Sequence, residues 1–132
     1  MLRHMRFQAK FIALPILFGS MGAALILAPS ASAHAVFVAS TPAKTSMVTK
    51  MPSTVSVRFD DKIIEIAGKH ANVLSVTDAK GHLISTGNAI VSGMSVSTAI
   101  KAGAAKGRVT LSWRVISDDG HPVMGISFFT FM

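Results

Sequence analysis

Hydrophobic and polar residues alternate along much of the chain after residue 34, and this pattern predicts β-strands. The clearest segment is 109–116, in which four apolar residues, the single tryptophan Trp113 among them, alternate with mostly polar ones. Segment 54–60 repeats the pattern with valine and phenylalanine on one side and Ser, Arg and Asp on the other. Period-two alternation of β-branched and aromatic residues is typical of a strand with one buried face.

Turn residues divide the remaining sequence into shorter predicted strands. Pro42 and Pro52 fit strand ends, because proline lacks an amide donor, and Asp78–Gly81 reads as a hairpin turn. No useful 3.6-residue stripe follows residue 34, so no helix is expected. The predicted strands are 35–40, 54–60, a short one over 63–66, 73–77, 82–85, 89–96 with an interruption at Gly93, 109–116, and 125–131, which is apolar on both faces.

Short strands at regular spacing indicate an all-β sandwich or barrel. The 132 residues suffice for one domain with a single small core. The sequence shows no internal repeat and no low-complexity segment.

The first 33 residues have the pattern of a secretory signal peptide. A basic head over 1–10 precedes an apolar run over 11–27, and the small residues Ala31-Ser32-Ala33 follow. An uncleaved membrane anchor is the alternative, but the apolar run is at the short limit for spanning a bilayer. We expect cleavage after Ala33, which leaves a periplasmic domain of residues 34–132. With no second long apolar stretch, this domain should have no stable membrane insertion.

Composition and charge exclude several classes of function. The chain has no cysteine, which excludes thiolate metal sites and redox-thiol chemistry. Its formal charge of +7 falls to +4 for residues 34–132, because three of the thirteen basic residues and none of the six acidic ones precede residue 34. The remaining positive charges are scattered singly, so no nucleic-acid partner is expected.

Two segments far apart in the sequence carry candidate metal ligands. After cleavage, His34 would offer both its α-amine and its imidazole. Asp119 and His121 are two residues apart before the last strand, and in an extended backbone such residues project to the same face, which favours Asp119 over Asp118 unless a turn intervenes. Taken alone, this segment also fits a polar turn followed by a surface histidine.

Both ends of the predicted domain carry a motif, and the two motifs together are more specific than either alone. The first is His34-Ala35-x-x-x-x-Ser40-x-Pro42-Ala43, and the second is Trp113-Arg114-Val115-x-Ser117-x-Asp119-Gly120-His121-Pro122-x-x-Gly125. The pair resembles the CopC family of exported copper-resistance proteins, to which the YobA-like branch is similar. The resemblance covers essentially all of residues 34–132, and the ends match better than the middle.

This resemblance implies an immunoglobulin-like Greek-key β-sandwich that binds one Cu(II). The implied ligands are the α-amine and imidazole of His34, the carboxylate of Asp119 and the imidazole of His121, and three nitrogens with one oxygen suit tetragonal Cu(II). The implied function is periplasmic copper homeostasis or resistance, by sequestering copper or delivering it to an inner-membrane, CopD-like transport protein. A monomer is expected.

Many family members also carry a methionine-rich segment that forms a separate Cu(I) site. Here Met47 and Met51 are separated by three residues, Met94 stands alone and Met124 follows the second motif. Thioethers favour Cu(I), but isolated methionines are more often core or surface residues. No second copper site is therefore expected.

Two rival functions remain open. A metal-free immunoglobulin-like interaction module would be favoured if the leader were cut elsewhere, since the amine ligand would be lost. An oxidative copper enzyme would need an aromatic substrate platform, and the chain has no tyrosine and one tryptophan, expected in the core. A carboxylate ligand would also occupy a position that oxygen chemistry needs open. We expect no enzyme activity, and we expect His70, His82, Arg58 and Lys62 to be solvent-exposed.

Overall fold

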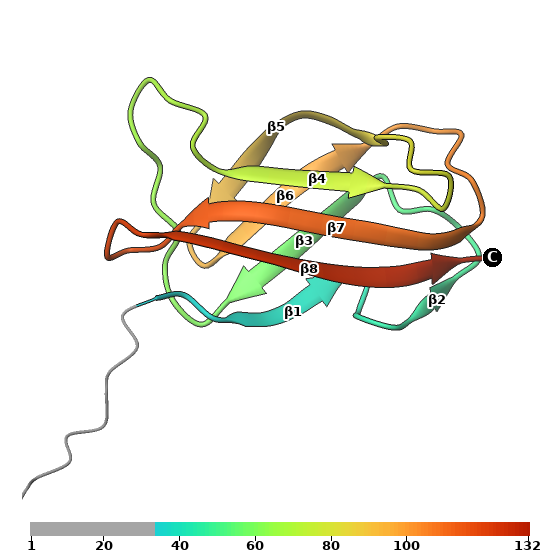
Figure 1. The fold of residues 1–132 in the computed structure, drawn as a ribbon, viewed down its shortest axis with the longest axis horizontal. Helices are drawn as coiled ribbons and strands as arrows, with labels where there is room; N and C mark the ends of the chain where they lie inside the picture. The colour runs from blue at the N-terminus through green and yellow to red at the C-terminus, as the bar shows by residue number, and fades with distance from the viewer. Residues whose placement is uncertain (1–33) are drawn as a thin grey trace, which may run out of the picture. The chain divides into compact units, whose positions relative to one another are not determined.

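The computed structural model describes residues 34–132, which form two four-stranded sheets packed face to face (Figure 1). Neighbouring strands are antiparallel, except that β2 runs parallel to β8. In spatial order, one sheet contains β1 (Phe37–Thr41), β3 (Thr54–Phe59), β6 (Ser95–Ile100) and β5 (Ser85–Ser92), and the other contains β2 (Met47–Val48), β8 (Pro122–Phe131), β7 (Gly107–Ile116) and β4 (Val73–Thr77).

The all-β sandwich predicted from the sequence is confirmed. Within residues 34–132 there is no helix with the length and hydrophobicity needed to cross a bilayer. The expected leader and its cleavage site fall in residues 1–33, outside the described residues.

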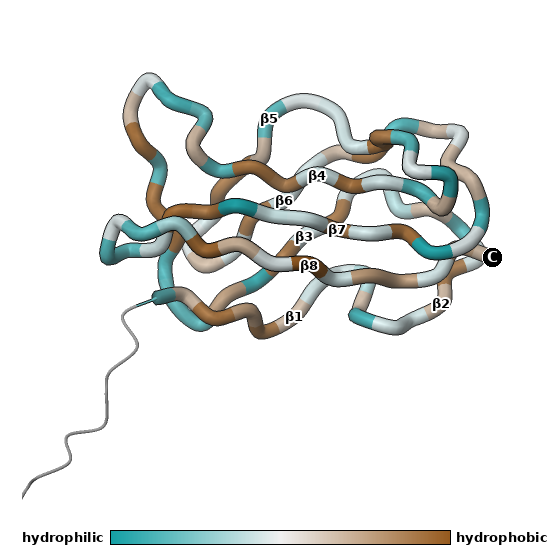
Figure 2. Tube along the Cα trace, in the orientation of Figure 1, coloured by the Kyte–Doolittle hydropathy of each residue, from teal (hydrophilic) through white to brown (hydrophobic). Residues whose placement is uncertain are grey.

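The core lies between the sheets, where the inward side chains of the alternating strands meet. Hydrophobic positions recur along the strands in Figure 2, whereas the connections at both ends mix hydrophilic and hydrophobic residues. Phe59 and Phe129 are the largest fully buried side chains, one from each sheet. The alternation that predicted 54–60 and 109–116 therefore marks the buried faces of β3 and β7.

Three predicted strands differ from the observed ones. Segment 63–66 contributes only one bridge, between Ile63 and Ser117. Segment 89–96 spans a hairpin, because Gly93, with a φ of 60°, forms the turn between β5 and β6 rather than a break within one strand. The last strand begins three residues early, at Pro122.

The predicted hairpin after β4 is also only partly formed. Thr77 and Leu83 make one bridge, and the chain then crosses to the other sheet, where β5 pairs with β6. Ile84, which is 2% exposed, enters the core at the crossing. The buried carboxylate of Asp78 holds the crossing, since it accepts hydrogen bonds from three backbone amides, those of Lys80, His82 and Ala105.

These amides, with that of Ala105 the strongest, lower the pKa of Asp78 to about 2. An unfolded aspartate titrates near 3.9, so the stabilisation is complete above about pH 4 and is lost as the pH falls towards 2. We expect Asp78→Asn to be less stable than the wild type at pH 6, with a difference that shrinks by pH 2.5, as measured by urea unfolding. Asp118→Asn, at an exposed turn residue, is the matched control. A difference that does not vary with pH would contradict this account.

Candidate metal centre

Three segments meet at one end of the sandwich, on the left in Figure 1. They are the arm 34–36 before β1, the connection 60–72 between β3 and β4, and the turn 117–121 between β7 and β8. The bridge between Ile63 and Ser117 joins the second to the third, and the amide of Ile64 donates to the carbonyl of Ile116 at 2.9 Å. The connection 60–72 is therefore attached to the turn that carries Asp119 and His121.

The arm is held by its second and third residues, which leaves the first exposed. Ala35 is buried in the core at 2% exposure. The amide of Val36 donates to Oδ1 of Asp60 at 2.6 Å, and the amide of Asp60 donates back to the carbonyl of Val36 at 3.0 Å. His34, with 55% of its side chain exposed, projects from this anchored arm.

The turn between β7 and β8 is closed by its own polar groups. The amide of Ser117 donates to the carbonyl of His121 at 3.0 Å, and the amide of Gly120 donates to the carbonyl of Ser117 at 2.8 Å. Gly120 has a φ of 84°, which glycine adopts without the steric cost that other residues pay. The expectation of an extended backbone over Asp119–His121 was wrong.

Asp119 and His121 converge for a different reason. The carboxylate of Asp119 folds back so that Oδ1 accepts from the hydroxyl of Ser117 and from the amide of His121, the latter at 3.1 Å. These contacts leave Oδ2 facing the two imidazoles. They are made by Asp119, the residue favoured from the sequence, and not by Asp118.

Three predicted ligand residues are brought together at this turn. Oδ2 of Asp119 lies 2.7 Å from Nδ1 of His34 and 3.1 Å from Nδ1 of His121. The two imidazole centroids are 5.0 Å apart, with the rings inclined at 68°. One potential ligand atom from each residue lies within 4.8 Å of the others. The cluster therefore joins residues that are 85 positions apart in the sequence.

The electrostatics of the cluster favour an ionised carboxylate. The hydrogen bond from Ser117, followed by those from the amide and imidazole of His121 and from His34, holds the pKa of Asp119 well below its usual value. In the metal-free protein a proton must lie between Oδ2 and each imidazole nitrogen for these contacts to be hydrogen bonds. A bound cation would replace those protons.

The donor set fits a small divalent ion. On a metal with bonds of about 2.0 Å at right angles, neighbouring donor atoms lie about 2.8 Å apart. The two oxygen–nitrogen distances in the cluster, 2.7 and 3.1 Å, are close to this spacing. The oxygen of Asp119 and either imidazole nitrogen could therefore be neighbouring donors on such an ion.

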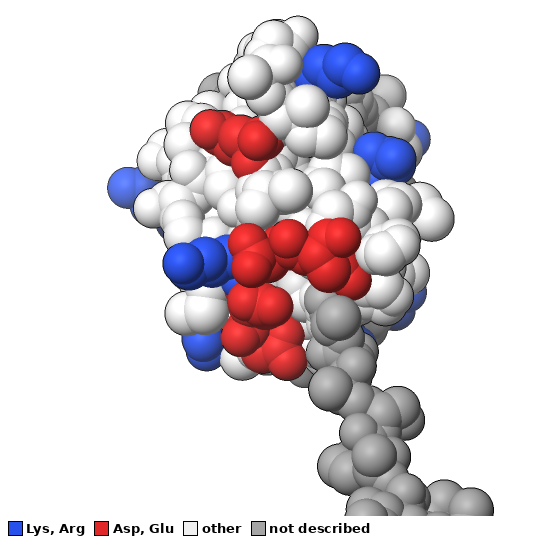
Figure 3. Space-filling view, turned by 90° about the vertical axis from the view of Figure 1, so that its left-hand side faces the viewer, with Lys and Arg blue, Asp and Glu red and all other residues white. Residues whose placement is uncertain are grey.

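Acidic residues gather on the end of the sandwich that carries the cluster (Figure 3). Of the six in the chain, only Asp78 lies elsewhere. Carboxylates near a site raise the local concentration of cations, and the exposed Lys62 and Lys69 on the connection 60–72 offset part of this charge. The acidic residues at this end are Asp60, Asp61, Glu65, Asp118 and Asp119.

The four methionines considered as Cu(I) ligands do not gather at one place. Met47 lies beside Thr130 in the strand register, whereas Met124 lies opposite Arg114, at the other end of β8. Six residues of β8 separate these positions, which corresponds to about 20 Å. Met51 packs against the core, and Met94 is half-exposed in the turn between β5 and β6.

The other residues named from the sequence lie as expected. His70, His82, Arg58 and Lys62 are exposed. Trp113 is buried, stacked on Phe37 with centroids 5.1 Å apart and in edge contact with Phe59 at 6.0 Å.

Sequence reasoning missed the contribution of Asp60, whose contact with the arm spans 24 residues and leaves no local signal. Ser117 and Gly125 were named only as members of a motif, and no structural role was expected for either. The spacing Ser-x-Asp could have indicated the hydroxyl–carboxylate contact in the turn. Gly125 lies opposite Trp113 in the register, and a Cβ added there would come within 2.5 Å of the indole.

Comparisons with known proteins agree with this architecture. The family model described as CopC domain matches residues 37–132, which include every strand but begin three residues after His34. The crystal structure of CopC from Methylosinus trichosporium OB3b is 27% identical, with a TM-score of 0.63, covering 74% of this chain and 93% of that one.

A second solved structure supports the fold alone. That of PcoC, a methionine-rich copper resistance protein from Escherichia coli, is 21% identical, with a TM-score of 0.61, covering 76% of this chain and 100% of that one. A comparison with curated proteins gives no match. Because the family model spans residues 37–132, well over half of the chain, the chain belongs to the CopC domain family.

Proposed function

We propose that residues 34–132, released by cleavage after Ala33, form a periplasmic protein that binds one Cu(II) as cargo. Membership of the CopC domain family gives the chain a function connected with copper. The observation that carries the proposal is the convergence of His34 with Asp119 and His121, although His34 and Asp119 are 85 positions apart in the sequence. The α-amine of His34, free after cleavage, would be the fourth ligand.

The orientation of His34 supports this ligand set. Its Nδ1 atom faces Asp119, and Nδ1 is the ring nitrogen that can close a six-membered chelate ring with the α-amine of the same residue. Three nitrogens and one oxygen match the preference of Cu(II) for tetragonal sites, and copper is bound more tightly than competing divalent ions at such a site. The neighbouring acidic residues would add long-range attraction.

The exposure of the cluster supports carrying rather than catalysis. The side chains of His34 and His121 are 55% and 66% exposed, so ligands of another protein could approach a bound ion directly. No aromatic side chain other than the two imidazoles is in contact with the cluster among the described residues. We therefore favour sequestration of copper, or its delivery to an inner-membrane CopD-like protein, over an enzymatic function.

Titration with Cu(II), followed by electron paramagnetic resonance, tests the proposal on protein shown by mass to begin at His34. We expect one equivalent to give an axial, nitrogen-rich signal. The affinity should fall as the pH drops below about 6 to 7, because a neutral amine and neutral imidazoles are required. A spectrum indistinguishable from adventitious copper, or an affinity that is flat across this pH range, would refute the proposal and favour a metal-free interaction module.

A further inference from the structure

The end of the sandwich opposite the candidate metal centre is basic. In the described part of the chain it carries six exposed cationic side chains, which lie on the connections that precede β2, β3, β5 and β7 and at the start of β7. The one acid at this end is Asp78, whose carboxylate is buried beneath three amides. No acidic side chain is therefore exposed among these cations, which are Lys44, Lys50, Lys80, Lys101, Lys106 and Arg108.

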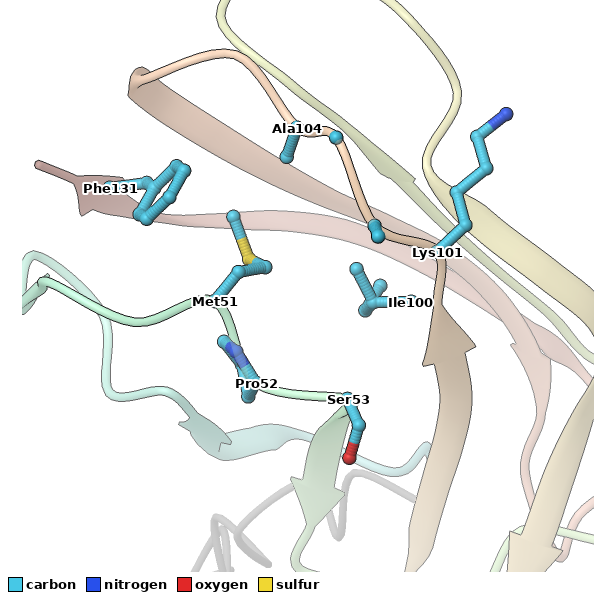
Figure 4. Close-up of a pocket in the computed structure, with 9 residues that line it drawn as sticks. Met51, Pro52, Ser53, Ile100, Lys101, Ala104 and Phe131 are labelled. Carbon is cyan, nitrogen blue, oxygen red and sulfur yellow. The ribbon is translucent and has the colours of Figure 1, made fainter.

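An apolar depression of about 410 Å³ lies among these cations (Figure 4). Its lining comes from three separate parts of the chain, 51–53, 100–104 and Phe131. Figure 4 shows Met51 pointing towards Phe131 and Lys101 extending from the rim into solvent. The volume is within the range of ligand pockets, roughly 300–1,000 Å³.

A second depression adjoins the first and extends it to another lysine. The two share residues 51–53, and the second is also lined by Lys50 and Thr54. The two depressions therefore border the same segment, 51–53, with Lys101 in the lining of the first and Lys50 in the lining of the second. We call this surface, formed by residues 50–54, 100–104 and Phe131, the basic groove.

We propose that the basic groove binds an extended, acidic segment of a partner protein, which inserts one apolar side chain beside Phe131 and Met51. The rim lysines would pair with acidic side chains flanking the inserted residue. Complementary charge of this kind speeds encounter and sets the register of the bound segment. The surplus of cations with no exposed acid makes a basic partner unfavourable.

The shape of the surface favours a protein segment over a membrane. Binding to a bilayer requires apolar side chains that protrude into the acyl region. In the basic groove the apolar side chains are partly buried and line a hollow, so a convex partner is needed to cover them. A single apolar side chain that projects from an acidic segment is convex enough to fill the hollow. The acidic residues beside it have the charge opposite to that of the rim lysines.

The position of the basic groove keeps the metal centre free. Strands β7 and β8 each have ten residues and run from one end of the sandwich to the other, a length of about 30 Å. A partner held at the basic groove would not cover His34, Asp119 or His121. Binding of a partner at the basic groove does not require metal, so metal-free protein is used in the test.

The test uses a fluorescent peptide in which glutamate alternates with serine around a single central leucine. We expect saturable binding at low salt, with chemical-shift changes centred on 100–104 and Phe131. The double variant Lys50→Glu/Lys101→Glu should weaken binding roughly tenfold or more, as should replacing the leucine of the peptide by serine. The matched control, Lys62→Glu/Lys69→Glu, makes the same change in net charge at the opposite end and should bind normally.

Three results would overturn the proposal. Equal loss of binding in the control variant would show attraction to overall charge alone. Tighter binding to phosphatidylglycerol vesicles than to the peptide, abolished by Lys50→Glu/Lys101→Glu, would assign the surface to a membrane. Self-association abolished by the same variant would assign it to a second copy, bound through its acidic end.

Discussion

A protein with one extra alanine before His34 is expected to lose more than about a hundredfold in Cu(II) affinity. The added residue turns the α-amine into an amide, which removes one of the four proposed ligands and its chelate ring. Loss of a group that only orients a ligand costs roughly 10–100-fold in metal affinity, so loss of a direct ligand should cost more. Competition titration against a chelator of known affinity measures the difference.

The fold should not respond to this change. The arm is anchored by buried Ala35 and by the paired backbone contacts of Val36 with Asp60, so the extended and native proteins should unfold at the same temperature without metal. His70→Ala, which removes an exposed imidazole, is the matched control for adventitious binding. Unchanged affinity in the extended protein would rule out the α-amine as a ligand.

Gly125→Ala is expected to destabilise the described domain strongly. The new Cβ would lie within 2.5 to 3.0 Å of three atoms of the Trp113 indole. That ring is held between Phe37 and Phe59, so it cannot move aside without disturbing the core. We expect a loss of about 2–3 kcal/mol, the upper part of the range for overpacking, measured by urea unfolding.

Two further variants isolate the cause. Ile126→Ala, at an exposed position on the same strand, should change stability by less than about 0.5 kcal/mol. In the double variant Gly125→Ala/Trp113→Phe, the smaller ring should relieve the clash, so the two losses should not add. If the losses in unfolding free energy of the two single variants added up, the destabilisation would not come from the contact between Gly125 and Trp113.

Sequence patterns identified best those strands that bury one face. Segment 54–60 differs from β3 by one residue, and 109–116 lies within β7, because period-two alternation records which side faces the core. Gly93 was ambiguous, since a glycine within an apolar stretch fits either a break or a turn. The two residues of β2 are too short to show a period.

Contacts between residues far apart in the sequence were harder to predict than the strands themselves. Nothing near Ser85 indicates that β5 leaves the sheet of β4 for the other sheet, because the crossing depends on Asp78 and on the distant amide of Ala105. The three proposed ligand residues were named from the two motifs, yet the reason given for the convergence of Asp119 with His121 was wrong. Their approach follows from a turn closed by Ser117, a contact that alternation cannot express.

The register of the β7–β8 ladder makes the turn a replaceable cassette. Ten consecutive pairs end at Ile116 opposite Pro122, and the contact between Ser117 and His121 closes the ladder beyond them. Residues 118–121 are exposed, so a designer could graft other four-residue turns here without altering a buried side chain of the hairpin. The same scaffold could thus display different side chains beside the imidazole of His34.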